Sequence, residues 1–212
     1  MARPKALIVG GGSKFGEAFS QIASNDYEIH VVTGSNSDAD KVIQVNWNEC
    51  KIDDVIPHLD QDYDIILFNQ NGGGAPNEVR INDEGAYSNF EQPIEWWNQA
   101  YFNNVQLSYY IVKHLDLRKG MKICWMLSPL LHYDNRYDGK PYGGYAGDKA
   151  YNAHIMKTFS FYNDASFYGL IPKHFGEIDL DFSACKIYDV IIKLKPELSG
   201  KFIDENGKIY GV

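Results

Sequence analysis

The sequence predicts an α/β protein whose parallel sheet is doubly wound, with helices on both faces. Two observations support this prediction. Short apolar segments alternate with longer helix-like segments along the chain, and a glycine-rich turn directly follows the first apolar segment. Neither repeats nor low-complexity tracts nor linker-like stretches divide the chain, so we expect residues 1–212 to form a single domain.

Each predicted strand is a short apolar run between polar or glycine residues, as expected for a strand buried on both faces. Strands are predicted over 6–9, 29–33, 42–45, 65–68, 122–127, 165–171 and 201–203, and helices over 15–23, 94–114, 145–162 and 188–194. Only residues 34–40 separate the second strand from the third. A parallel crossover usually takes a dozen or more residues, so this connection is predicted to be a loop without a helix.

The composition of the chain limits the kinds of molecule that we expect it to bind. The chain carries a formal net charge of −8 and contains no basic run, which argues against nucleic acid and against an anionic membrane surface. Cys50, Cys124 and Cys185 are too few and too widely spaced for a disulfide framework or a metal site. No segment has the length and apolarity of a membrane helix or of a signal peptide. We therefore expect a cytoplasmic protein that binds no metal.

The glycine turn is the first candidate binding site. It contains Gly10, Gly12, Ser13, Lys14, Phe15 and Gly16. Glycines between a strand and a helix let the backbone approach a pyrophosphate, while the helix N-terminus supplies N–H groups and the positive end of its dipole. An ordinary strand-to-helix turn is the alternative. We favour a Rossmann-type dinucleotide site because the turn directly follows the first apolar strand.

The end of the second predicted strand bears on the choice of dinucleotide. An acidic side chain there would accept a hydrogen bond from the 2′-hydroxyl of an adenosine ribose, as NAD requires. The residue at this position is Gly34, and Ser35 follows it. Ser35 could donate to a 2′-phosphate, and Lys14 could supply positive charge. The sequence therefore favours NADP, with NAD as the alternative.

A second candidate site is formed by Tyr145 and Lys149, which lie four residues apart on a predicted helix and hence on the same helical face. A nearby ammonium group stabilises phenolate and lowers the pKa of the phenol, which makes the tyrosine a usable proton donor or acceptor. The chain contains 15 tyrosines, so the spacing alone is weak evidence. Two amphipathic side chains on a solvated helix are the alternative.

The order of these motifs resembles that of the short-chain dehydrogenase/reductase family over nearly the whole chain. The glycine turn is similar to the family's Thr-Gly-x-x-x-Gly-x-Gly motif, although Lys14 replaces its middle glycine. Residues 69–72 are similar to the Asn-Asn-Ala-Gly segment. The remaining matches in family order are Asn104, Ser128, Tyr145 with Lys149, Pro172 and the closing residues 199–207.

This resemblance implies a role for each matched residue. Tyr145 would exchange a proton with the substrate oxygen, Ser128 would position that oxygen, and Lys149 would lower the pKa of Tyr145 and hold the nicotinamide ribose. Asn104 would anchor a water linking Lys149 to solvent, although Asn103 beside it could take that role. The resemblance also places Asn69, Gly72 and Pro172 next to the cofactor.

Two departures from the family pattern affect how the site is covered. The segment between Pro172 and Leu198 is shorter than the family's substrate lid, whereas the loop after Ser128 is longer than usual. An open site would follow, or a lid built from the loops at 73–93 and 129–144.

We therefore expect an NAD(P)-dependent oxidoreductase that acts on a small-molecule carbonyl or alcohol. A non-catalytic NADP-binding regulator on the same fold is the first alternative. A nucleotide-sugar epimerase would need a substrate domain after Pro172 for which few residues remain, and a scaffold would not need the catalytic set. The resemblance also implies a homodimer or homotetramer paired through 94–114 and 145–162. Ile155, Met156, Phe159 and Phe161 support this, because they make the second helix apolar beyond one stripe.

Overall fold

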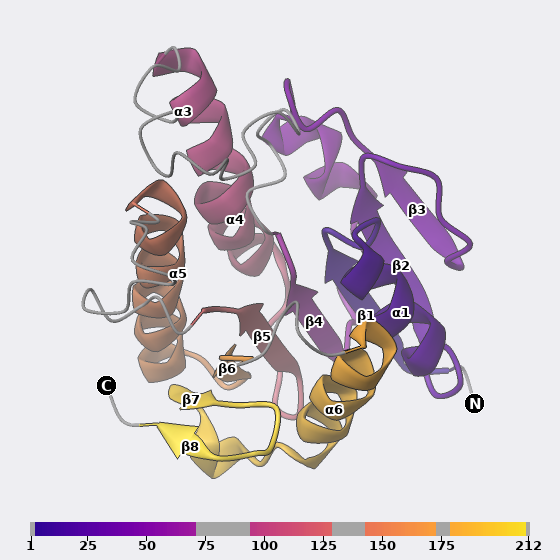
Figure 1. Ribbon diagram of the computed structural model, residues 1–212, viewed down its shortest axis with the longest axis vertical. Coiled ribbons are helices and arrows are strands. Elements are labelled where there is room, and N and C mark those ends of the chain that lie inside the picture. The colour runs from indigo at the N-terminus through magenta and orange to yellow at the C-terminus, as the bar shows by residue number, and fades with distance from the viewer. Residues whose placement is uncertain (1–2, 71–93, 129–142, 173–178, 211–212) are drawn as a thin grey trace.

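The computed structural model describes residues 3–70, 94–128, 143–172 and 179–210, with the backbone alone at 143–146 (Figure 1). One eight-stranded sheet forms the centre, in the order β3-β2-β1-β4-β5-β6-β7-β8. The first seven of these strands pair in parallel, and β8 pairs antiparallel with β7. The predicted α/β fold with a doubly wound parallel sheet is confirmed.

The strand predictions agree with the structure to within a residue or so at each end. The observed strands are β1 (Lys5–Val9), β2 (Glu28–Thr33), β3 (Lys41–Gln44), β4 (Ile65–Phe68), β5 (Lys122–Met126), β6 (Ser166–Leu170), β7 (Lys201–Ile203) and β8 (Ile209–Tyr210). The predicted loop at 34–40 is confirmed, since no helix forms between β2 and β3.

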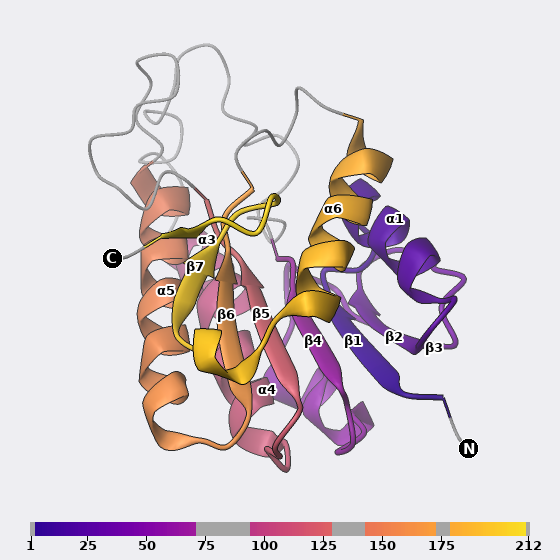
Figure 2. The same ribbon diagram turned by 90° about the horizontal axis from the view of Figure 1, so that it is seen from below.

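Helices cover both faces of the sheet, as Figures 1 and 2 show. One face is covered by α1 (Lys14–Ala23) and α6 (Leu180–Lys193), which pack against each other. The other face is covered by the π-helical turn η4 (Phe102–Gln106), α4 (Leu107–His114) and α5 (Gly143–Tyr162), and α3 (Ile94–Tyr101) leads into η4. Three short 3₁₀ turns complete the described elements: η1 (Ile52–Asp54), η2 (Ile56–His58) and η6 (Pro196–Leu198).

The central strands are apolar throughout because each face of the sheet has its own core. In β1, Leu7 and Val9 join the core under α4 and α5, while Ala6 and Ile8 join the core under α1 and α6. All four side chains are at most 1% exposed. Side chains of a strand point alternately to opposite faces, so a strand buried on both faces needs an unbroken apolar run.

Two helix predictions need correction. The helix expected over 94–114 is interrupted by the π-helical turn at Phe102–Gln106. The helix expected over 188–194 begins instead at Leu180, where the side chain of Asp179 accepts a hydrogen bond of 3.1 Å from the Asp181 N–H. A side-chain acceptor at this position satisfies one of the unpaired N–H groups at a helix start, so Asp179 is the signal that the prediction missed.

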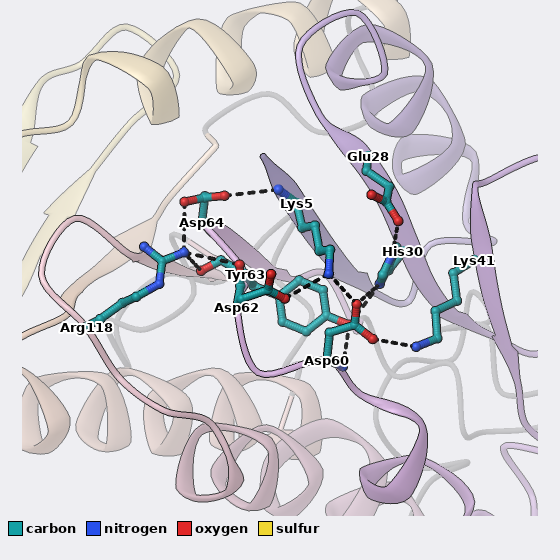
Figure 3. A network of polar contacts seen from close by, with 9 residues as sticks. All are labelled: Lys5, Glu28, His30, Lys41, Asp60, Asp62, Tyr63, Asp64 and Arg118. Atoms are coloured by element: carbon teal, nitrogen blue, oxygen red, sulfur yellow. Dashed lines mark hydrogen bonds and ion pairs between the residues drawn. The ribbon is translucent and has the colours of Figure 1, made fainter. Parts of the chain in front are cut away.

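Ion pairs join neighbouring segments at the amino-terminal edge of the strands (Figure 3). The Asp60 carboxylate accepts hydrogen bonds of 2.6 Å from both Lys5 and Lys41, and Arg118 pairs with Asp64 at 2.9 Å. The two lysines hold the pKa of Asp60 at about 2, below its ordinary value. This edge lies opposite the end of the strands that carries the predicted site, so we assign the network to stability.

Candidate active site

Several of the predicted site residues that the structure describes lie at the carboxyl-terminal edge of the sheet. Asn69, Ser128 and Pro172 follow β4, β5 and β6, and the glycine turn follows β1. In the sheet, β1 lies between β2 and β4. The chain adds β2 and β3 on one side of β1 and then adds β4 and the later strands on the other side, so the direction of strand order reverses next to β1. Ligands of open α/β sheets bind in the crevice that such a reversal leaves at the carboxyl ends of the strands.

The glycine turn is held tightly against its neighbours. Gly10 has a φ of 84°, and a Cβ atom there would lie 3.1 Å from the Asn69 backbone. At Gly16 a Cβ atom would lie 2.7 Å from the carbonyl oxygen of Gly11. The Gly10 and Gly11 N–H groups both donate to the carbonyl oxygen of Val32. A phosphate would therefore be met by later amides of the turn and by the start of α1.

Ser35 lies beside this turn. A Cβ atom at Gly12 would come within 2.1 Å of both Oγ of Ser35 and Oγ1 of Thr33. These two hydroxyl groups are 3.1 Å apart and hydrogen-bonded. Lys14 is exposed, whereas the side chain of Phe15 is buried against Phe19 in the core under α1. Phe15 therefore faces away from the crevice and could serve a ligand only through its backbone.

Asn69 connects the end of β4 to the glycine turn. Its Nδ2 donates to Oγ of Ser13 at 2.8 Å and to the carbonyl oxygen of Gly10 at 3.3 Å. The Oδ1 atom is buried and has no hydrogen-bond partner among the residues described. A buried acceptor without a donor is costly, so this oxygen marks a place that a bound donor would satisfy.

Lys149 is the most deeply buried charged side chain of the site, with 2% of its surface exposed. Its Nζ donates to the carbonyl oxygen of Gln70 at 2.9 Å and to that of Met126 at 2.8 Å. The ammonium group therefore bridges the carboxyl ends of β4 and β5. Burial lowers the pKa of Lys149 to about 8, and the nearby carboxylate of Asp148 opposes this shift.

The π-helical turn aims two adjacent asparagines in different directions. Nδ2 of Asn104 donates to the Asp148 carboxylate on α5 at 2.9 Å, and the Asn104 carbonyl oxygen accepts from Nδ2 of Asn152 at 2.8 Å. Asn103 instead donates to the carbonyl oxygen of Trp47 at 2.6 Å. Of these two side chains, that of Asn104 faces the helix of Lys149, and that of Asn103 faces the loop after β3. Its Oδ1 is buried without a donor within the described ranges.

The remaining predicted residues follow β5 and β6 or lie wholly or partly outside the described residues. Ser128 is buried two residues beyond the end of β5, and Pro172 is buried two residues beyond the end of β6. The backbone of Tyr145 lies in the first turn of α5, but its side chain is outside the described residues. Gly72 and the predicted covering loops at 73–93 and 129–142 are also outside them. Gly143 and Gly144, expected in the second loop, belong to α5.

Sequence reasoning missed three residues of this region. Asp148 lies beside Asn104 and Lys149, Gln70 supplies a carbonyl oxygen to Lys149, and Trp47 lies against Gly34. Asp148 could have been found, because a carboxylate directly before a site lysine is visible in the sequence. The contact between Trp47 and Gly34 depends on how the loop after β3 folds back, which no local pattern encodes.

Known proteins resemble this chain in structure but not detectably in sequence. No protein-family model matches, and no curated protein sequence matches. The solved Sniffer protein of Caenorhabditis elegans covers 100% of both chains with a TM-score of 0.75 and 13% identity. Carbonyl reductase Sniffer of D. melanogaster also covers 100% of both, with a TM-score of 0.73 and 15% identity.

A short chain dehydrogenase from Salmonella enterica covers 96% of each chain, with a TM-score of 0.68 and 14% identity. The solved structures with high similarity are consistently short-chain dehydrogenases and reductases. Identities of this size bear on architecture rather than on chemistry. The expected resemblance is confirmed at that level: the chain has the fold of the short-chain dehydrogenase/reductase family.

Proposed function

We propose that this protein is an NAD(P)-dependent oxidoreductase that interconverts a small carbonyl compound and its alcohol. The observation that carries the proposal is the buried ammonium group of Lys149, held by two backbone carbonyl oxygens at the carboxyl edge of the sheet. Burying a lysine is costly unless its charge is satisfied, and a pKa near 8 suits a group that works close to neutral pH. Structural neighbours that are carbonyl reductases support the same reaction class.

The residues near β1 and β4 fit a dinucleotide. Gly12 and Gly16 leave no room for a Cβ atom, as expected for a dinucleotide-binding glycine turn that packs closely against the neighbouring strand and helix. The N-terminus of α1 offers the positive end of its dipole at the same place. The unpartnered Oδ1 of Asn69 could accept a hydrogen bond from the bound molecule. These features support nicotinamide dinucleotide binding across the turn, Asn69 and Pro172.

The reaction assigns separate tasks to the chain's own groups. The nicotinamide, when bound, supplies or accepts the hydride. Tyr145 would give a proton to the carbonyl oxygen in reduction, or accept one from the alcohol in oxidation. Lys149 would stabilise the resulting phenolate, and the Ser128 hydroxyl would hold the substrate oxygen in place.

Asn104 would complete the proton path between Lys149 and solvent. Its buried Oδ1 lacks a donor among described residues, so a water molecule held there would satisfy an otherwise unpaired acceptor. The hydrogen bond to Asp148 fixes the amide so that this oxygen, rather than the NH₂ group, is left to receive the water. The arrangement supports Asn104 as the anchor of a water.

NADP is the proposed cofactor, with NAD as the alternative. Gly34 provides no carboxylate for a ribose 2′-hydroxyl, and the Ser35 hydroxyl lies against the turn where it could donate to a 2′-phosphate. Lys14, two residues after Gly12 in the turn, is exposed and adds positive charge. Each of these features favours an anionic group at the 2′ position.

We further propose that the chain pairs with a second copy through α4 and α5. A groove of about 870 Å³ lies between these helices, lined by aromatic side chains that include Tyr109, Tyr110, Tyr151 and Tyr162. Tyr151 is 51% exposed and Tyr162 is 81% exposed. A cluster of exposed aromatic rings is typical of a surface that a partner covers.

Most of the apolar residues on α5 that predicted this interface are buried within the chain itself. Ile155, Met156 and Phe159 are at most 8% exposed and belong to the chain's own core. Of the four apolar residues that predicted the interface, only Phe161 is exposed. The sheet therefore covers more of α5 than the sequence suggested. The proposed dimer is supported instead by the exposed tyrosines of the groove.

A binding titration followed by a turnover assay tests the proposed function. Enhancement of nicotinamide fluorescence would report binding of NADPH and NADH, and a panel of aldehydes and ketones would then be screened for NADPH oxidation. We expect binding and turnover with at least one carbonyl compound. Binding without turnover on any compound would favour the regulatory alternative, and absence of binding to both dinucleotides would contradict the proposal.

A further inference from the structure

We propose that the indole ring of Trp47 forms a wall of the adenosine end of the cofactor site and sets its preference for a 2′-phosphorylated dinucleotide. This inference rests on the proposed function. Trp47 lies in the loop that follows β3, 13 residues beyond the end-of-strand position Gly34, and its side chain is half-buried.

The indole ring occupies the space that a side chain at position 34 would need. A Cβ atom added at Gly34 would lie 2.7 Å from Cδ1 of Trp47 and 3.0 Å from Nε1. Real Cβ atoms essentially never approach another heavy atom within 3.0 Å. An acidic residue cannot be placed at position 34 without moving the ring. The indole ring of Trp47 and a carboxylate at position 34 therefore exclude each other.

The edge of the indole ring that faces Gly34 carries a hydrogen-bond donor where an acidic side chain would provide an acceptor. A carboxylate is an acceptor and suits the 2′-hydroxyl of NAD, whereas the indole Nε1–H is a donor only. A donor beside the ribose suits a phosphate oxygen. The flat apolar face of the same ring offers a surface on which an adenine base could stack. Trp47 therefore replaces a group that selects NAD with one that favours NADP.

Ser35 supplies a second donor from the neighbouring position. Its hydroxyl lies with Thr33 on the side of Gly12, whereas the Cβ direction of Gly34 leads to Trp47. The end of β2 is therefore flanked by the glycine turn on one side and by the indole ring on the other. A ribose placed over this strand end would lie between a hydroxyl donor and an N–H donor.

The loop that carries Trp47 is fastened to the helix that carries Asn104. The Trp47 carbonyl oxygen accepts a hydrogen bond of 2.6 Å from Nδ2 of Asn103, and the Cys50 carbonyl oxygen accepts one of 3.0 Å from Nε2 of Gln99. The indole ring also packs against the core under α4 and α5. These contacts hold the ring in position before a ligand arrives, as a specificity-determining wall requires.

Exchanging the ring for a carboxylate tests the inference directly. The chains to compare are the wild type, Gly34→Asp, Trp47→Ala and the double variant, with dissociation constants for NADPH and NADH measured by calorimetry and folding checked by thermal unfolding. Gly34→Asp alone should lower Tm, because its Cβ atom meets the ring. The double variant should recover Tm and change the NADPH-to-NADH affinity ratio by at least about tenfold toward NADH.

A more conservative substitution distinguishes a loss of cofactor binding from a folding defect. Trp47→Phe keeps an aromatic ring but removes the N–H donor, so NADPH affinity should fall several-fold while NADH affinity stays nearly unchanged. Trp47→Phe should also lose most of the quenching of tryptophan fluorescence that NADPH causes in the wild type. Trp97→Phe on α3 is the matched control, and it should retain both the quenching and the affinity ratio.

The outcomes separate this inference from the proposed function. If the wild type binds neither dinucleotide, both fail. If it binds NADPH but the affinity ratio is unchanged in Trp47→Phe and in the double variant, the role of Trp47 is wrong and the proposed function stands. A preference for NADH in the wild type would also overturn the inference.

Discussion

Nδ2 of Asn104 donates a hydrogen bond of 2.9 Å to the carboxylate of Asp148, the residue directly before Lys149. The bond joins the π-helical turn to α5 and brings a carboxylate close to the buried ammonium group. Burial raises the pKa of Asp148, whereas the bond from Asn104 and the charge of Lys149 lower it. Asp148 is thus placed to position Asn104 and to influence the protonation of Lys149.

Asp148→Asn should shift the pH profile of the reaction. The Asp148 carboxylate raises the pKa of Lys149, so its removal should let that pKa fall further below about 8. The ammonium form is the one that stabilises phenolate, so activity in reduction should be lost at a lower pH than in the wild type. The measurement is kcat/KM against pH, with the exposed Asp164→Asn as control. If kcat/KM falls at the same basic pH in Asp148→Asn as in the wild type, Asp148 does not influence the protonation of Lys149.

Lys149→Met should change how stability depends on pH. The pKa of Lys149 is about 8 in the folded chain and 10.5 ordinarily, so between these values the unfolded chain binds more protons. The free energy of unfolding of the wild type should therefore contain a term that rises with pH from about 8 to 10.5. Urea unfolding across this range should show a smaller rise in Lys149→Met, and equal rises would contradict a buried amine of lowered pKa.

Asp60→Asn should weaken the amino-terminal edge of the sheet without affecting the site. The ionised carboxylate bonds Lys5 and Lys41, and its loss should cost about 1 kcal/mol at pH 7. Because the pKa of Asp60 is lowered to about 2 from 3.8, this contribution should be present above pH 3.8 and fade as pH falls toward 2. Chemical unfolding of Asp60→Asn beside the exposed Asp53→Asn measures the effect, and equal stability of both variants at pH 7 would refute it.

Charge placed in the groove between α4 and α5 should separate the subunits. Light scattering at low micromolar concentration should give at least twice the 24.1 kDa mass of one chain for the wild type. Tyr151→Glu combined with Tyr162→Glu would bury two charges at the interface and should yield a monomer. Glu substitution of the exposed Phe182 on α6 is the control. A wild-type mass of 24.1 kDa would show that this surface is not a dimer interface.

The sequence predicted the layered fold well because its signals are local. An apolar run such as residues 65–68 indicates a strand buried on both faces, and glycines after the first strand indicate the close approaches found at Gly10 and Gly16. The π-helical turn at Phe102–Gln106 was not predictable, because nothing in its composition distinguishes it from an α-helix.

The candidate site was predictable where a residue follows a strand and less so where it depends on packing. Asn69 and Ser128 occupy the expected strand ends. The separate directions of Asn103 and Asn104 depend on the π-helical turn, and the contact of Trp47 with Gly34 depends on a loop that folds back over β2. Such relationships arise from tertiary structure, which residue spacing does not record.

Comparing Tyr145→Phe with the wild type tests the central proposal most directly. Each protein would be titrated with NADPH and then assayed for turnover of the best carbonyl compound from the screen. We expect the variant to bind NADPH as tightly as the wild type, whereas its kcat should fall by about a hundredfold or more because the proton donor is lost. Turnover within about tenfold of the wild type would contradict the proposed role of Tyr145, because the proton would then come from another group.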